Sequence, residues 1–191
     1  AAITPTAAPA FDNEGRMAHP LLRTEPRLCL WRALTDNDAS VILDHRFVRT
    51  GFFALTLQNL TTEVAADGSV WQTLRYSTAF GDEVLHRRRV VRLGVGDFSF
   101  EETVTLPEST SDGLRVGVEF ELVAGFDDAE WVGLGPWENY PDRRASALHG
   151  TWASSIDDLA VPYLDPQENG GRGEVSSLVL TGPAGTVTTT H

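Results

Sequence analysis

The sequence has 191 residues, enough for one domain with a sizeable core, and the composition of an ordinary globular protein. Its formal net charge of −12 argues against electrostatic attraction to nucleic acid or anionic lipid, because both are polyanions. No apolar run reaches the roughly 20 residues of a membrane helix, and the first residues lack the pattern of a signal peptide. We therefore expect a single domain over residues 1–191, located in the cytoplasm.

Single residue types exclude several kinds of chemistry. Cys29 is the only cysteine, so an intrachain disulfide is impossible, and its position between two leucines predicts a small buried hydrophobe. All 15 cationic side chains are arginines, which excludes Schiff-base lysines and the lysine of a phosphate-binding loop. The five histidines lie far apart with no short metal-ligand spacing, so we predict no metal site in this chain.

The first element in chain order is a short helix, predicted over residues 38–47. The stretch "LWRALTDNDAS" precedes it, with Trp31 and Arg32 followed by three closely spaced polar residues, Asp36, Asn37 and Asp38. Their oxygens could hold a calcium or sodium ion, or they could cap the helix by accepting backbone N–H bonds. We favour capping.

Strands dominate from about residue 70 onward, because apolar and polar residues alternate there with a period of two. Four strands are predicted, over residues 71–80, 83–94, 97–106 and 113–123. In the third, Phe98, Phe100, Val104 and Leu106 share a face. In the fourth, the shared face holds Leu114, Val116, Val118, Phe120 and Leu122. Turn signals recur about every ten residues, a spacing typical of an antiparallel β-sandwich.

Three consecutive arginines, Arg87, Arg88 and Arg89, lie in the second of these strands. Successive residues of a strand point to opposite faces, so at most two of them project the same way. Acidic residues are plentiful nearby, and we therefore predict cross-strand pairs with glutamates such as Glu101 or Glu102 on a solvated sheet face, not a nucleic-acid site.

The stretch "GLGPWENYPDR", Gly133 to Arg143, must be extended before each of its prolines. It is compatible with two interpretations. Trp137 and Tyr140 offer flat faces to a sugar, while Glu138, Asn139, Asp142 and Arg143 offer hydrogen bonds to hydroxyl groups. Alternatively, the stretch is a corner stiffened by Pro136 and Pro141, in which the aromatic rings pack and Arg143 holds Glu138 or Asp142, with two parallel bonds where the geometry allows.

A third polar stretch, "PYLDPQENGGRG", follows from Pro162 to Gly173. Gly170 and Gly171 predict positive φ angles and a tight return of the chain. Glu168 and Glu138 are the best candidates for the paired carboxylates of a glycosidase, although the sequence gives no distance between them.

Taken together, the three stretches resemble, in order and spacing, the C-terminal small-chain domain of bacterial lactose-cleaving β-galactosidases. The family patterns are W-R-A-P-T-D-N-D, G-L-G-P-x-E-N-Y-P-D-R and Y-x-x-P-x-E-N-G. This chain matches all of them closely, with Leu34 in place of the proline in the first pattern and Trp137 at the open position of the second. The third pattern is matched by Tyr163, Pro166, Glu168, Asn169 and Gly170.

The resemblance implies an all-β fold, the antiparallel β-supersandwich of the galactose-mutarotase type. It also implies that the family's domain continues beyond His191, so we expect this chain to be an incomplete, N-terminal portion with exposed strand edges that favour self-association. The family's catalytic glutamates and metal ligands lie in a preceding (β/α)₈ barrel, which nothing in this chain resembles.

We therefore expect a non-catalytic accessory domain that packs on the barrel or large chain of a β-galactosidase and helps to shape its sugar site. The whole enzyme is expected to use Mg²⁺ and Na⁺, with no cofactor in this chain. Trp137, Glu138, Asn139 and Arg143 are the expected contacts to a galactoside. The structural motif comprises Trp31, Arg32, Asp36, Asn37, Asp38, Tyr140, Pro141, Asp142, Glu168, Asn169 and Gly170.

Two alternatives remain open at this point. One is an independent mutarotase, for which His149 and Glu168 are the nearest candidates to exchange protons with the sugar ring, although no mutarotase motif surrounds either residue. The other is a carbohydrate-binding module without an enzyme.

Overall fold

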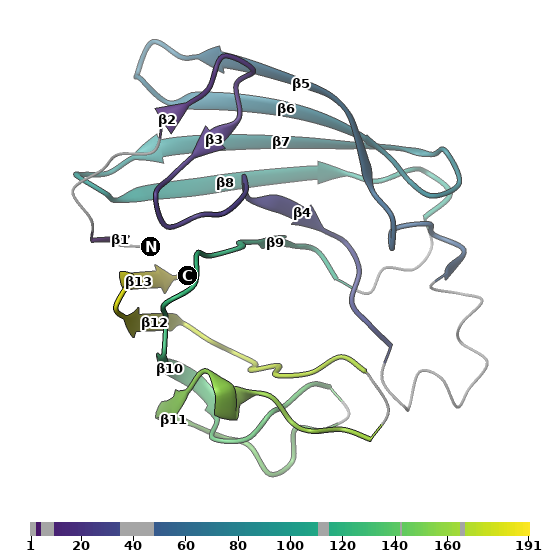
Figure 1. The fold of residues 1–191 in the computed structure, drawn as a ribbon. Coiled ribbons are helices and arrows are strands. Elements are labelled where there is room, and N and C mark those ends of the chain that lie inside the picture. Colours follow the sequence, from purple (N-terminus) through teal and green to yellow (C-terminus); the bar gives the residue numbers. More distant parts are fainter. Residues whose placement is uncertain (1–2, 5–9, 35–47, 111–114, 142, 165–166) are drawn as a thin grey trace. The chain divides into compact units, whose positions relative to one another are not determined.

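The computed structural model describes residues 3–4, 10–34, 48–110, 115–141, 143–164 and 167–191, and most of its regular structure is β-strand (Figure 1). The chain forms two compact units: unit 1 comprises residues 1–8, 94–97 and 123–191, and unit 2 comprises residues 9–93 and 98–122. All paired strands run antiparallel in the described ranges, which confirms the predicted all-β class. The single domain over residues 1–191 stays a prediction.

Unit 2 is built on a four-stranded sheet with the strand order β5-β6-β7-β8 (Figure 1). Its strands are β5 (Thr56–Val64), β6 (Val70–Ser77), β7 (Glu83–Arg92) and β8 (Phe98–Thr105). Two short pairs complete the unit: β2 (Ala10–Phe11) with β3 (Met17–Ala18), and β4 (Arg27–Cys29) with β9 (Gly117–Glu119).

One face of this sheet is buried, because every second residue of β6 and β7 points into the unit. The core cluster comprises Leu28, Leu30, Phe52, Leu74, Tyr76 and Val84. Alternation therefore predicted β6, β7 and β8 to within about three residues at each end, which is the usual precision for element boundaries. Cys29, at the end of β4, is half-buried and its thiol donates to the carbonyl of Trp31 at 3.1 Å.

The predicted strand over residues 113–123 is wrong in its extent. Within its described residues, 115–123, only Gly117–Glu119 forms a strand, and an isolated bridge joins Leu22 to Leu122. Val116 and Phe120, expected on its apolar face, are exposed. The physical reason is that, among the described strands, β9 pairs with the three-residue strand β4 alone, which is too short to extend the pairing along the alternating sequence.

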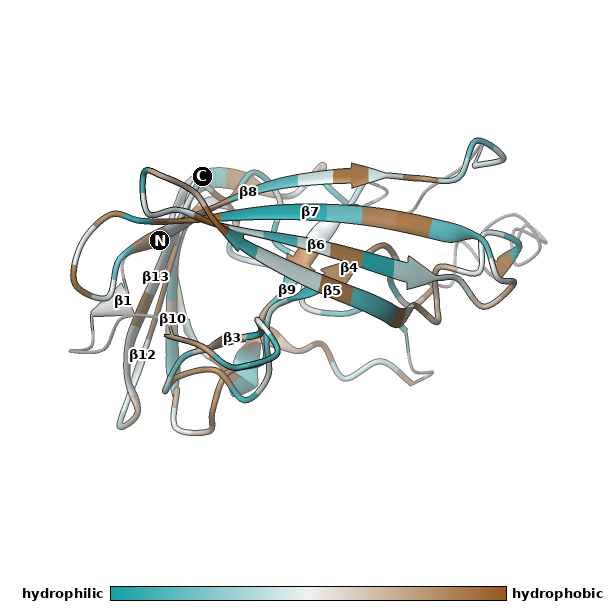
Figure 2. Cartoon of the chain, turned by 90° about the horizontal axis from the view of Figure 1, so that it is seen from above, coloured by the Kyte–Doolittle hydropathy of each residue, from teal (hydrophilic) through white to brown (hydrophobic). Residues whose placement is uncertain are grey.

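The arginine run of β7 corrects another expectation. Arg89 forms the predicted cross-strand pair with Glu101, at 3.0 Å on a partly exposed face. The solvated face predicted for the run is wrong for Arg88, whose side chain is fully buried and bonds to Glu102. Figure 2 shows this part of β7 as hydrophilic, so hydropathy alone could not reveal which arginine points inward.

Unit 1 contains a five-stranded sheet with the strand order β1-β13-β12-β10-β11. Its strands are β1 (Ile3–Thr4), β10 (Asp128–Gly135), β11 (Leu148–Ser155), β12 (Ser177–Gly182) and β13 (Gly185–Thr190). A single 3-10 turn, η1 (Asp157–Leu159), follows β11. Ala129, Trp131, Leu134 and Val187 are buried within the unit. The helix predicted over residues 38–47 lies outside the described residues.

Candidate functional site

The stretch from Gly133 to Arg143 begins as the end of strand β10 and continues as a tight corner. Gly135 closes the strand, and the backbone N–H of Arg143 donates to the carbonyl of Tyr140 at 2.8 Å. Extended backbone up to Pro136, followed by a turn, is the arrangement that the prolines predicted. Of the two interpretations, the corner matches this backbone path.

Glu138 lies at the centre of a polar cluster inside this corner. Its side chain has no exposed surface, and one carboxylate oxygen accepts hydrogen bonds from the Tyr163 hydroxyl and from Arg143 at 3.2 Å. The other oxygen accepts the backbone N–H of Gly170 at 2.6 Å. These donors satisfy the buried charge and tie two segments, residues 136–143 and 163–170, to each other.

Arg143 and Tyr163 form the outer part of this cluster. Arg143 donates a single bond to Glu138 and another to the Tyr163 oxygen at 2.7 Å, so the expected pair of parallel bonds is not formed with Glu138. Asp142, the other expected partner, lies outside the described residues. Because the Tyr163 oxygen accepts from Arg143, its own proton points to Glu138. This hydrogen bond to a carboxylate raises the pKa of Tyr163 to about 12.

Asn139 and Asn169 bind backbone groups on neighbouring segments. The Asn139 side chain accepts from Gly173 N–H at 2.7 Å and donates to the carbonyls of Leu134 and Trp137. Asn169 forms two bonds with the backbone of Val161, at 2.8 and 2.6 Å. Both amides therefore act as structural cross-links.

Positive φ angles were predicted for both Gly170 and Gly171, but only Gly170 has one. Gly170 has φ +77°, as predicted, whereas Gly171 does not have a positive φ. A Cβ on Gly171 would lie 3.0 Å from the carbonyl oxygen of Asn139, so that position is selected by close packing. The backbone N–H of Asn139 donates to the Gly171 carbonyl at 2.8 Å across the same gap.

Arg172 completes this region and was not identified from the sequence. Its guanidinium lies 5.1 Å from the centre of the Trp131 ring and donates to the carbonyls of Gly170 and Gly171. Burial lowers the pKa of Arg172, while the charge of Glu138 acts in the opposite direction. The signal in the sequence was that Arg172 is the sole cation of the stretch "PYLDPQENGGRG".

The remaining predicted site residues differ in placement. Trp137 is 65% exposed, Pro141 is exposed, and Tyr140 and Glu168 are half-buried. Asp36, Asn37, Asp38 and Asp142 lie outside the described residues. Trp31 and Arg32 belong to unit 2, where Trp31 contacts Phe53 and Arg32 donates to the carbonyl of Ala33.

The polar contacts of Glu138 bear on the paired-carboxylate hypothesis. A general acid or base must reach the proton that it transfers. Glu138 is buried and each of its oxygens is already bonded, so it is held as a structural anion. A hollow of about 470 Å³ in the described part of unit 1 lies over strands β10 to β12, and none of the predicted site residues lines it.

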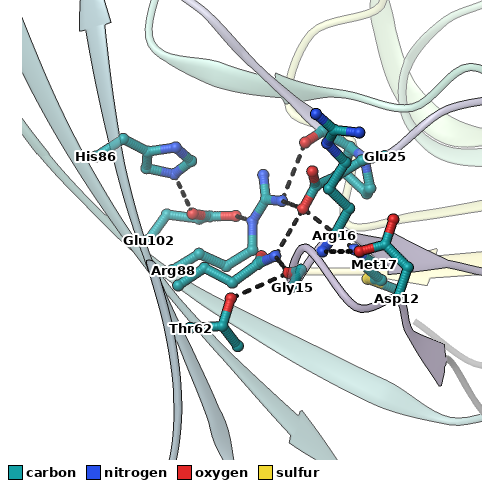
Figure 3. Close-up of polar contacts among 11 residues, drawn as sticks. Asp12, Gly15, Arg16, Met17, Glu25, Thr62, His86, Arg88 and Glu102 are labelled. Atoms are coloured by element: carbon teal, nitrogen blue, oxygen red, sulfur yellow. Dashed lines mark hydrogen bonds and ion pairs between the residues drawn. The ribbon is translucent and has the colours of Figure 1, made fainter. Parts of the chain in front are cut away.

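Unit 2 contains a second polar cluster, on the buried face of its sheet (Figure 3). The Glu102 carboxylate lies between two side chains of β7: one oxygen bonds to the His86 ring and the other accepts from Arg88 at 2.8 Å. Arg88 also donates to the Pro26 carbonyl at 3.0 Å and lies 3.9 Å from Glu25. Burial acts to raise the pKa of Glu102, but the bond from His86 and the charge and bond of Arg88 hold it below 4.5.

The same cluster fixes the β2–β3 turn against the sheet. Gln72 of β6 donates to the Gly15 carbonyl at 2.7 Å and to Glu25 at 2.6 Å, and Thr62 of β5 donates to Gly15 at 3.1 Å. The contacts join residues up to 57 positions apart in the sequence, so their pairing could not be predicted from local patterns. These residues connect structural segments and form no open site.

The residues that the structure describes include no candidate metal cluster and no candidate membrane span. No group of three or more histidine, cysteine, aspartate or glutamate side chains is placed to hold a metal ion there. No helix within the same ranges is long and apolar enough to cross a membrane.

Comparisons with known proteins give the chain its family. The profile of the family described as "Beta galactosidase small chain" matches residues 11–189. A β-galactosidase of Erwinia tasmaniensis is 31% identical over 173 residues, which cover 84% of this chain and 17% of the relative. "Beta-galactosidase 2" of Enterobacter cloacae is 33% identical over 165 residues, or 78% of this chain and 16% of the relative.

A shorter match has higher identity: a β-galactosidase of Oenococcus oeni is 45% identical over 80 residues, 40% of this chain and 8% of the relative. The matched residues thus span 8 to 17% of the length of these three relatives. The family match covers far more than half of the chain and includes all three sequence stretches. The chain belongs to the β-galactosidase small-chain family.

Proposed function

We propose that this chain is a non-catalytic accessory part of a β-galactosidase. It packs on the catalytic part of the enzyme and helps to shape the sugar site, while the whole enzyme hydrolyses terminal β-D-galactosides such as lactose. The family match over residues 11–189 and the names of the relatives support this proposal. The Mg²⁺ and Na⁺ expected for the whole enzyme would then bind outside this chain.

The observation that supports a non-catalytic role is the state of Glu138. Its carboxylate is buried and accepts bonds from Arg143, Tyr163 and Gly170, which leaves neither oxygen available to a substrate. Glu138 and Asn139 therefore act on the sugar site only through the backbone that they hold. Among the four expected sugar contacts, Trp137 offers the largest exposed surface and is proposed to touch the galactoside.

The substitution Glu138→Gln in the complete enzyme separates structure from catalysis. The glutamine amide has one acceptor oxygen where the glutamate carboxylate has two, so one hydrogen bond inside the corner is lost. We therefore expect a lower melting temperature. Below that temperature, kcat on a nitrophenyl galactoside should stay within about twofold of the parent, whereas loss of a general acid or base lowers rates by about 10²–10⁴-fold.

Glu130→Gln is the matched control, because Glu130 lies exposed on strand β10 of the same unit. We expect this variant to change neither the melting temperature nor kcat. A large fall in kcat for Glu138→Gln, in a protein that melts like the parent, would contradict the proposed non-catalytic role.

A further inference from the structure

Three aromatic side chains form a patch on unit 2, here called the aromatic patch: the half-buried Trp31 and the exposed Phe53 and Phe80. The ring centres of Trp31 and Phe53 are 5.9 Å apart, and those of Phe53 and Phe80 are 6.3 Å apart. Phe53 is 45% exposed and Phe80 is 61% exposed. Contiguous exposed apolar surface of this kind marks interaction sites in proteins, whereas isolated exposed residues need no explanation.

The backbone that carries the aromatic patch is tightly held. Phe52, the neighbour of Phe53, is buried in the core cluster of unit 2, so adjacent phenylalanines point in opposite directions. The N–H of Ala79 donates to the Gly51 carbonyl at 3.0 Å, and the N–H of Phe80 donates to the Thr78 hydroxyl at 3.2 Å. A surface that is ordered before it binds loses little entropy on binding.

The turn that carries Phe53 also fits closely against the turn that carries Phe80. Gly51 has φ +69°, and a Cβ at that position would lie 3.1 Å from atoms of Thr78, Ala79 and Phe80. Gly51 therefore lets the turn of Phe53 approach the turn of Phe80, and this approach brings the two exposed rings into contact.

The ring geometry favours a protein over a sugar as the occupant. The interplanar angles are 70° and 78°, so the three rings meet edge to face and present an irregular relief. A sugar stacks on one flat aromatic face, whereas the cores of protein interfaces are rich in aromatic side chains that fill pockets of the partner. In the relatives from Erwinia tasmaniensis and Enterobacter cloacae, more than four-fifths of the polypeptide lies outside the matched residues. The corresponding part of a β-galactosidase is therefore the partner that this surface would meet.

We propose that the aromatic patch is the anchor with which this chain docks on the rest of the β-galactosidase. The inference rests on the proposed function and adds a surface to it. The partner surface is expected to be apolar, with a pocket for the ring of Phe80, the most exposed of the three.

Hydroxyl-radical footprinting tests this docking surface without altering the protein. The isolated chain is compared with the complete enzyme, purified through a tag on this chain and checked for galactosidase activity. We expect oxidation of Phe53 and Phe80 to fall by about tenfold in the complete enzyme, because an interface core excludes water. Phe120, which is 41% exposed in the same unit, serves as the reference phenylalanine.

A pair of variants provides a second measurement. In the complete enzyme, Phe80→Ser should shorten the half-life of activity on heating, whereas Val64→Ser, at an exposed position at the end of β5, should leave it unchanged. Equal shortening by both variants would count against the proposal.

Each other outcome of the footprinting also has a meaning. Unchanged oxidation of Phe53 and Phe80, relative to Phe120, in an active enzyme would overturn the docking surface and leave the proposed function standing. If lactose protects Phe53 and Phe80 of the isolated chain from oxidation, the aromatic patch is a sugar site and not a docking surface for the enzyme. If protection of the isolated chain grows with its concentration, the occupant of the patch is a second copy of the chain. If no galactosidase activity is recovered with the tagged chain, the proposed function fails and the docking surface falls with it.

Discussion

Replacement of Arg88 by methionine is the strongest test of the buried cluster in unit 2. The methionine keeps much of the apolar length of the side chain but removes the cation that faces Glu102 and Glu25. Removing one partner of a buried ion pair costs about 3–5 kcal/mol, since it leaves a charge without compensation. Glu102 keeps its bond to His86, so we expect the lower end, about 3 kcal/mol.

The magnitude can be converted into a melting temperature. For a chain of this size, 1 kcal/mol shifts the midpoint by about 2–4 °C, so Arg88→Met should lower it by about 6–12 °C. Thermal unfolding followed by far-ultraviolet circular dichroism measures this shift, and urea unfolding gives the free energy of unfolding.

Arg89→Met is the matched control, because Arg89 is the next residue of β7 and points to the other face. Its partners Asp67 and Glu101 are exposed, and ion pairs between exposed groups contribute little. We expect its midpoint to stay within the scatter of the measurement. Equal midpoints for the Arg88 and Arg89 variants would refute the assignment of Arg88 to a buried, stabilising cluster.

Three further predictions follow from other contacts. Because the pKa of Glu102 is lowered on folding, its contribution to stability is complete above pH 4.5 and is lost as the pH falls through the lowered pKa. In acid unfolding, Glu102→Gln should therefore flatten the loss of stability with falling pH, and an unchanged pH profile would contradict this prediction. The pKa of Tyr163 is raised from 10.0 to about 12, so the contribution of Tyr163 to stability is complete below pH 10 and is lost as the pH rises through 12. Ultraviolet titration should show a phenol ionisation near pH 12. Tyr163→Phe should remove this step, and Glu138→Gln should move it to lower pH. Gly15→Ala should destabilise strongly, because Gly15 has φ +79° and the new Cβ would lie 2.1 Å from the hydroxyl oxygen of Thr62. Gly68→Ala is the control: Gly68 has φ +81° but open space around it, so this variant should show only the backbone strain of about 1–2 kcal/mol. Equal unfolding midpoints for the two variants would contradict the close contact at Gly15.

Strands β6, β7 and β8 of unit 2 were predictable because alternation is a local property. Residues two apart in β8 share a face, so the side of Phe98 and Phe100 could be read from the sequence. Glu102 lies on that same face by the same rule, yet a carboxylate there suggests solvent until its partner is known. That partner, Arg88, lies on the neighbouring strand directly opposite.

The candidate site was predictable in its location more than in its role. The prolines and glycines between Gly133 and Gly173 indicated a rigid corner, and the resemblance placed it in a small-chain domain. The bonds that give Glu138 its structural role come from residues as far as 32 positions away, at Gly170. Such contacts depend on how the chain folds back on itself, which local patterns do not encode.

Proton NMR of a lactose solution tests the central claim most directly, because it follows hydrolysis and the exchange of sugar anomers in one tube. The isolated chain and the complete enzyme are each added at the same molar concentration. The account predicts free galactose with the complete enzyme, and neither hydrolysis nor faster anomer exchange with the isolated chain. Galactose released by the isolated chain, or anomers that equilibrate faster in its presence, would contradict a non-catalytic accessory part.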